Sequence, residues 1–117
     1  MSYTDHAAEA ADRRREAKRQ YHQAWKNAER ADAQYRHAAR IRRHVAWLTQ
    51  RPDLWGPDDQ GTPASWEGDI RSALRLADTY LRSSFAAAER SAFYRDLARR
   101  YDEMAATKAA RLAEATS

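Results

Sequence analysis

Four histidines are the side chains of this sequence that could bind a transition metal, and all of them lie within residues 1–50. His37 and His44 are seven residues apart, which places both on one face of a helix, but no acidic residue lies between them. A di-iron helical bundle uses Glu-x-x-His motifs, and the chain contains none. We therefore expect neither a metal site nor a cofactor, and we interpret the histidines as surface residues.

Serine hydroxyls are the other groups that could act as nucleophiles. The serines of the second half of the chain, apart from the last residue, are Ser65, Ser72, Ser83, Ser84 and Ser91. None of them has a histidine nearby in the sequence, whereas a serine nucleophile needs an adjacent base. The chain also lacks a Gly-rich phosphate-binding loop, and the absence of cysteine excludes thiolate chemistry, disulfides and cysteine-ligated zinc. We expect a protein that is not an enzyme.

Two clusters of basic residues stand out within residues 1–50, which carry 11 basic and 6 acidic side chains. The first cluster, residues 13–19, contains one acidic residue, and the second, residues 36–44, contains none. Three arginines and a nearby tryptophan follow steps of four, three and four residues and so form one helical stripe: Arg36, Arg40, Arg43 and Trp47. The full set of candidate partner-binding residues is Arg36, Arg40, Arg43, Trp47, Arg13, Arg14 and Lys18.

Three interpretations of this basic face remain open. It could bind nucleic-acid phosphates and stack a base on Trp47, it could bind an acidic protein surface, or it could be a solvated helix face. Ion pairs between residues four apart, such as Glu9 with Arg13 and Asp32 with Arg36, would neutralise part of the charge. Such pairs do little for the second cluster.

A long helix must carry both clusters. Residues 3–50 contain no proline or glycine, so we expect one continuous helix over about this range. Ser2 or Thr4, together with Asp5, can cap its start. Pro52 disfavours helical geometry at the residue before it, which should end the helix near residue 50.

A heptad-like seam of small and aromatic residues runs along this first helix. Its members are Ala17, Tyr21, Ala24, Ala28, Ala31, Tyr35, Ala38, Val45 and Leu48, with Arg42 filling one place. Alanines at a helix contact let two antiparallel helices approach closely, and we expect the tyrosines to fill the gaps with their hydroxyls at the rim.

Residues 51–62 form the predicted turn, because they contain two of the three prolines and two of the three glycines. Three of the four tryptophans gather around it. Two interpretations remain: the aromatic residues close the end of the hairpin, or they form a partner-binding tip. The candidate tip residues are Leu54, Trp55, Asp58, Asp59 and Trp66.

We expect a second helix over about residues 63–114, with Thr62 as its cap and Pro63 at its first position. Its apolar face is broader than one partner helix can cover. This width predicts self-association through Ile70, Leu74, Leu81 and Phe85, most simply as two hairpins in a four-helix bundle. The predicted fold is all-α: a single domain, residues 1–117, built as a long antiparallel two-helix hairpin with an Ala-rich, coiled-coil-like seam.

Hydropathy limits the location of the chain. No apolar run approaches the roughly 18 residues that span a bilayer. The short apolar segment at residues 7–11 precedes the arginines of residues 13–15, which is the reverse of the order in a signal peptide. We expect a soluble, cytoplasmic protein without membrane contact.

Trp66-Glu67-Gly68 reads W-x-G beside the predicted turn. This arrangement is similar to the small secreted WXG family of the type VII secretion systems, and it implies a secreted helical hairpin that dimerises. Trp66 lies well past the usual position, and alanine replaces the acidic residue of the family's C-terminal motif after both Tyr94 and Tyr101. The acidic pair Asp58-Asp59 at the turn also resembles the coiled-coil fingers that enter the RNA polymerase secondary channel, although those factors carry a globular domain.

These features together predict a non-enzymatic helical interaction or assembly protein. It should be a homo-oligomer that presents a basic helix face to an acidic protein or a nucleic acid. One alternative is an Arg-rich accessory protein that binds nucleic-acid backbone without sequence specificity, and a further alternative is a small WXG-like secreted hairpin protein.

Overall fold

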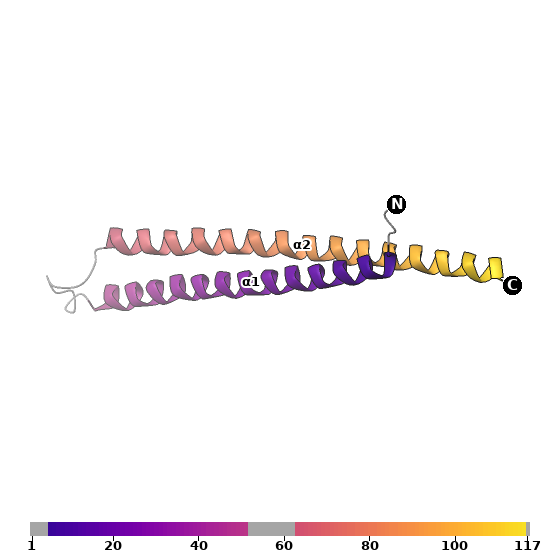
Figure 1. Cartoon of the computed structure of the whole chain (residues 1–117). Coiled ribbons are helices and arrows are strands. Elements are labelled where there is room, and N and C mark those ends of the chain that lie inside the picture. Colours follow the sequence, from indigo (N-terminus) through magenta and orange to yellow (C-terminus); the bar gives the residue numbers. More distant parts are fainter. Residues whose placement is uncertain (1–4, 52–62, 117) are drawn as a thin grey trace. The chain divides into compact units, whose positions relative to one another are not determined.

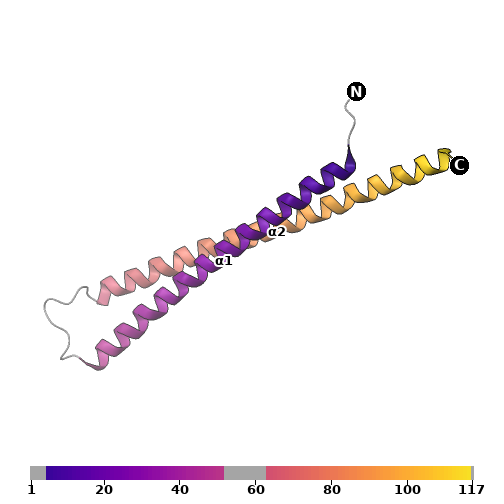
Figure 2. The same ribbon diagram turned by 60° about the horizontal axis from the view of Figure 1, so that its bottom comes forward.

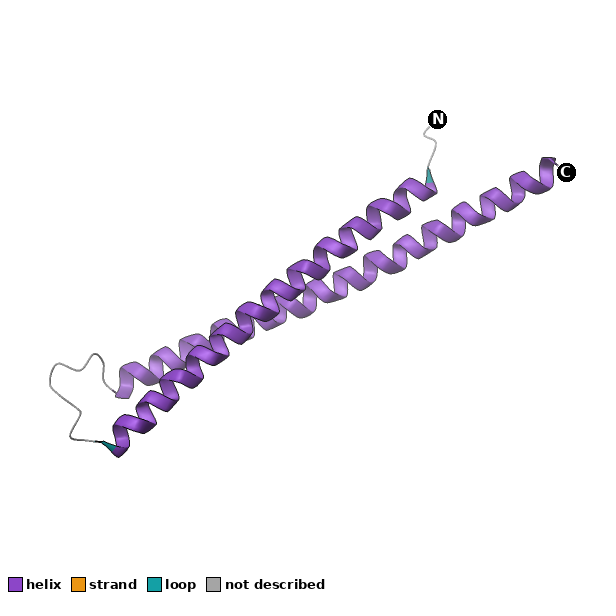
Figure 3. Ribbon diagram, turned by 90° about the horizontal axis from the view of Figure 1, so that it is seen from below, coloured by secondary structure: helices purple, strands orange, loops and turns teal. Residues whose placement is uncertain are grey.

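A computed structural model describes residues 5–51 and 63–116 of the chain. They form two helices, α1 (His6–Gln50) and α2 (Pro63–Thr116), which pack as a hairpin (Figure 1). Among the described residues only Asp5 and Arg51 lie outside these helices, and none is in a strand (Figure 3). The prediction of an all-α helical hairpin is confirmed.

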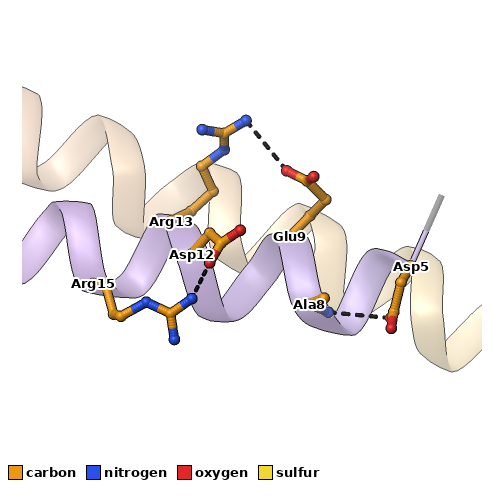
Figure 4. A network of polar contacts seen from close by, with 6 residues as sticks. All are labelled: Asp5, Ala8, Glu9, Asp12, Arg13 and Arg15. Atoms are coloured by element: carbon orange, nitrogen blue, oxygen red, sulfur yellow. Dashed lines mark hydrogen bonds and ion pairs between the residues drawn. The ribbon is translucent and has the colours of Figure 1, made fainter.

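Asp5 caps the start of α1. Its Oδ1 atom accepts a hydrogen bond of 3.1 Å from the backbone N–H of Ala8 (Figure 4). Its carbonyl oxygen accepts one of 3.0 Å from the N–H of Glu9. A carboxylate in this place satisfies a helix N–H that has no partner within the helix. The other candidate caps, Ser2 and Thr4, lie outside the described residues.

Prolines lie at the end of α1 and at the start of α2 in the sequence. At the end of α1 the N–H of Arg51 donates to the carbonyl oxygen of Leu48 at 3.0 Å, which tightens the last turn before Pro52. Pro63 is the first residue of α2, where its missing N–H costs nothing. Of the residues proposed for the turn, Thr62 and the tip candidates Leu54, Trp55, Asp58 and Asp59 lie outside the described residues. Over the described residues, neither helix has a segment that is both long and apolar enough to span a membrane.

The described residues divide into two compact units, each made from a segment of both helices. The first unit contains residues 5–25 and 85–116, and the second contains residues 26–51 and 63–84. Figure 2 shows the indigo segment of α1 beside the orange segment of α2 within the first unit. The helices run antiparallel in both units. In the first, Ala17 contacts Ser91 and Gln20 contacts Arg90. In the second, Arg30 lies over the ring of Tyr80 and His44 contacts Trp66.

Alanines seven residues apart form the α1 side of both interfaces, which confirms the predicted Ala-rich seam. The members in the first unit are Ala10, Ala17 and Ala24, and those in the second are Ala31 and Ala38, all at most 7% exposed. Facing them, the buried α2 residues of the first unit are Ala87, Ser91 and Ala98, and those of the second are Trp66, Ala73, Ala77 and Ser84. Such small side chains on both helices permit a close helix–helix approach.

The second column of the predicted seam is wrong. Tyr21 is 54% exposed and Tyr35 is 42% exposed, and Ala28 and Arg42 are exposed as well. A mostly polar column three residues after each alanine takes this place: its members Arg13, Gln20, Gln34 and Ile41 are partly buried, and Asn27 is buried. Backbones that approach closely leave little room for a tyrosine ring between them, so the rings lie on the flank of the interface.

Candidate partner-binding surfaces

Three arginines of α1 form the arginine stripe of the second unit: Arg36, Arg40 and Arg43. All three are exposed, and together with Ala33 they line one shallow depression of about 270 Å³. The helix carries them there because their spacing of four and three residues keeps them on one face. The structure thus brings together the three arginines of the predicted stripe.

Only one arginine of the stripe has a carboxylate partner within the described residues. Arg36 donates from its Nε atom to Oδ2 of Asp32 at 2.8 Å. No described carboxylate lies within ion-pair distance of Arg40 or Arg43. The depression therefore holds at least two guanidinium groups whose donors face solvent, an arrangement suited to a phosphate or a carboxylate.

Trp47 continues the stripe and is 49% exposed. His44 stacks against it, with ring centroids 6.3 Å apart and an interplanar angle of 26°. The same histidine meets Trp66 of α2 edge to face at 6.1 Å. Trp66 itself is only 8% exposed, so its side chain packs within the second unit.

The first basic cluster is largely paired. Arg13 binds Glu9 at 3.3 Å, and Arg15 binds Asp12 (Figure 4). Arg14 reaches across to α2, where its guanidinium binds both carboxylate oxygens of Asp102 at 2.9 and 3.0 Å.

Arg19 binds Glu16, whose other oxygen accepts a hydrogen bond of 3.1 Å from the amide of Gln20. The hydrogen bond from Gln20, together with that from Arg19 and the charges of Arg19 and Arg13, lowers the pKa of the Glu16 carboxyl below its ordinary value, against a smaller opposing effect of burial. Lys18 is exposed, and no described carboxylate lies within ion-pair distance of it.

A larger groove lies between the helices of the first unit, on the side where Lys18 projects. Its volume is about 490 Å³, and its lining residues are Arg14, Ala17, Lys18, Tyr21, Ser91 and Arg95. A buried hydrogen bond crosses its floor, because the Ser91 hydroxyl donates to the carbonyl oxygen of Ala17 at 2.8 Å. Sequence reasoning included Arg14 and Lys18 among the candidates but missed Arg95, since its position opposite Lys18 depends on the register of the two helices.

Three exposed aromatic rings lie in the same unit as this groove, and one of them, Tyr21, lines it. Tyr21, Trp25 and Phe85 are 54%, 58% and 62% exposed. The sequence signal for the two rings of α1 is a run of residues at steps of four, three and four that contains no acid: Arg14, Lys18, Tyr21 and Trp25. Because Tyr21 also fits the heptad spacing of the predicted seam, sequence analysis placed it in the helix contact and not in this exposed run.

The residues proposed for self-association differ in how far α1 covers them. Ile70, Leu74 and Leu81 are partly buried in the second unit, while Phe85 in the first unit is mostly exposed. Leu76 is 41% exposed and lies beside Asp69 and His37 in a shallow depression. The α2 helix therefore keeps apolar surface that its partner helix does not cover.

No group of three or more His, Asp or Glu side chains that could hold a metal ion occurs within residues 5–51 and 63–116. No protein-family model, no curated protein and no solved structure matches this chain. A functional proposal must therefore come from the surfaces themselves.

Proposed function

We propose that this chain is a non-enzymatic, cytoplasmic helical interaction protein that associates with itself through α2 and presents the arginine stripe to an acidic protein partner. The observation that carries the proposal is the pair Arg40 and Arg43, two exposed guanidinium groups in one depression without a carboxylate partner among the described residues. Arginine binds carboxylates with two parallel hydrogen bonds, and its weak hydration makes it well suited to interface ion pairs.

Self-association rests on the apolar surface of α2. Leu74 and Leu81 are partly exposed after α1 has packed, and they lie seven residues apart, on one side of the helix. Burying apolar area contributes roughly 25 cal/mol per Å², and a helix whose apolar face is broader than its partner covers favours contact with a further helix. Two hairpins joined in this way would form a four-helix bundle.

Nucleic-acid backbone is the second candidate partner, and Trp47 is the observation that favours it. Its ring is 49% exposed at the end of the arginine stripe, where a base could stack while the arginines neutralise phosphates. An acidic protein surface requires no such stacking.

A binding titration with three polyanions separates the two partners. The probes are poly-glutamate, generic duplex DNA and single-stranded RNA, each measured at low and at high salt. If poly-glutamate binds the wild-type protein and Arg40→Glu/Arg43→Glu abolishes this binding, the acidic-protein partner is supported. Nucleic-acid binding whose affinity falls steeply with salt, with a log–log slope of about −0.9 for each phosphate neutralised, supports the second candidate.

The matched control for this titration is Arg75→Glu/Arg82→Glu, which makes the same charge change at exposed positions of α2 in the same unit. Circular dichroism checks that both double variants have the helicity of the wild-type protein, and all three probes are titrated against each. If none of the three polyanions binds at low salt, both candidates are overturned. If the two double variants lose the same binding affinity, the net charge of the protein explains the binding and the arginine stripe does not.

Sedimentation equilibrium tests self-association separately. The wild-type protein should be a dimer or a larger assembly at tens of micromolar, and Leu74→Gln/Leu81→Gln should shift it to monomer while circular dichroism reports unchanged helicity. A wild-type monomer in this range contradicts the four-helix bundle but leaves the arginine stripe untouched.

A further inference from the structure

One side of the first unit joins an apolar strip to the groove between the helices. On α2 the residues at steps of three, four and three share one side of the helix: Phe85, Ala88, Ala92 and Arg95. All four are exposed. Since Arg95 lines the groove together with Lys18 and Tyr21, this α2 strip and the acid-free run of α1 border the same groove.

The register of the helices places two of the exposed rings at one level. The hydrogen bond between Ser91 and Ala17 sets that register. Trp25 follows Ala17 by about 12 Å along α1, and Phe85 precedes Ser91 by about 9 Å along α2 at a rise of 1.5 Å per residue. In an antiparallel pair both displacements run in the same direction, so the rings flank one end of the groove.

The charge of the groove has one sign. Lys18 and Arg95 have no carboxylate within ion-pair distance among the described residues, and Arg14 alone is neutralised, by Asp102. No lining residue is acidic. The surface thus combines an aromatic end with two unpaired cations, one from each helix.

We propose that this groove is the docking site for an amphipathic helix of a partner protein, whose apolar side chains contact Trp25 and Phe85 and whose carboxylates bind Lys18 and Arg95. Helices dock in apolar grooves through residues three and four apart, and large aromatic rings are frequent interface anchors. This inference deepens the proposed interaction role by naming the kind of partner, but it uses none of the residues of the arginine stripe.

Charge complementarity favours an acidic helix over the two other occupants. A second copy of this chain that docked through the same side would bring a second Lys18 and Arg95 to a groove whose lining offers no free carboxylate, and like charges in an interface are costly. Nucleic-acid backbone needs several phosphate contacts to bind tightly, whereas here only two cations are unpaired and three aromatic rings are exposed.

The test uses two designed 20-residue helical peptides as probes. Both carry leucines at steps of three and four residues, and the flanking positions are glutamate in one peptide and lysine in the other. Titration calorimetry with the full chain should give the glutamate peptide at least about tenfold higher affinity than the lysine peptide. Lys18→Glu/Arg95→Glu should reverse this order, and Trp25→Ala should weaken the glutamate peptide by about tenfold or more.

Arg111→Glu is the control for a charge reversal outside the groove, because Arg111 is exposed on α2 and does not line this groove. Its effect on the glutamate peptide should be less than about twofold. Trp25 is exposed, so its replacement should leave the helical circular dichroism signal unchanged.

Three results would overturn the docking site: no binding of the glutamate peptide at millimolar concentration, equal affinity for both peptides, or conversion of a wild-type dimer to monomer by Trp25→Ala, which would assign the surface to a second copy. Arg40→Glu/Arg43→Glu should leave peptide binding unchanged. Failure of the arginine stripe and failure of this groove are therefore separate outcomes.

Discussion

The buried hydroxyl of Ser91 donates a hydrogen bond of 2.8 Å to the carbonyl oxygen of Ala17, and this bond joins the two helices of the first unit. Ser91→Ala removes the bond but leaves a small side chain at the contact, so the free energy of unfolding should fall by about 1 kcal/mol. Ser91→Leu should cost more, about 1–3 kcal/mol, because it overpacks a site that is 1% exposed.

Urea denaturation followed by circular dichroism measures both changes. Ser83→Ala is the control, since Ser83 is exposed on the same helix and its replacement should change stability by less than about 0.5 kcal/mol. Equal effects of Ser91→Ala and Ser83→Ala would contradict the importance of the buried bond.

Ala31 and Ala28 distinguish the observed interface from the predicted seam. Ala31 is 2% exposed, whereas Ala28, three residues earlier, is exposed. Ala31→Leu should therefore destabilise the fold by about 1–3 kcal/mol because it forces the helices apart, while Ala28→Leu should stay within about 0.5 kcal/mol of wild type. Thermal unfolding of the two variants gives the comparison. Equal destabilisation by both variants would support the predicted seam, which contained Ala28 as well as Ala31.

The ion pair of Arg14 with Asp102 crosses between the helices, but both side chains are about half exposed. A double-mutant cycle with Arg14→Ala and Asp102→Ala should give a coupling energy of at most about 1 kcal/mol, which decreases in high salt. A coupling that persists in high salt would mean that water reaches the pair less than its exposure indicates.

The pKa of Glu16 is lowered in the folded protein, mainly by the hydrogen bond from Gln20. Its carboxylate therefore stabilises the fold above the ordinary pKa of a glutamate, and this contribution is lost as the pH falls through the lowered value. Glu16→Gln should remove that part of the acid sensitivity, so its melting temperature should fall less than that of wild type between about pH 5 and about pH 3. Parallel pH profiles of the two proteins would exclude the effect.

The helical architecture and the arginine stripe could both be predicted because they depend on local spacing. Prolines near residues 50 and 63 limit the helices, and the alanines of the heptad repeat mark the contact face. Arg36, Arg40 and Arg43 share a face for the same reason, since side chains three and four residues apart are neighbours on any helix. None of these features requires knowledge of the partner helix.

The prediction of the seam was wrong at its second column, because the spacing of residues in one helix does not show how closely the other helix approaches. Beside each alanine the chain offers two columns, one containing Tyr21 and Tyr35 and the other containing Gln20 and Asn27. Hydrophobicity favours the tyrosines, but closely approaching helices leave space only for slimmer side chains, so Asn27 is buried and both rings are exposed. The distance between the two backbones decides which column is buried. That distance is a property of the packed pair of helices, so it cannot be read from either helix alone.

Local sequence features were enough to place the helices, most alanines of the contact face and the arginine stripe, because each follows from the 3.6-residue period and from the backbone limits of proline. Only the folded structure shows that Ser91 bonds to Ala17, that Arg95 and Lys18 line one groove, and that the rings of Trp25 and Phe85 are exposed in the same unit. These relationships depend on the register of two antiparallel helices, and the register results from packing between residues about 70 positions apart in the chain.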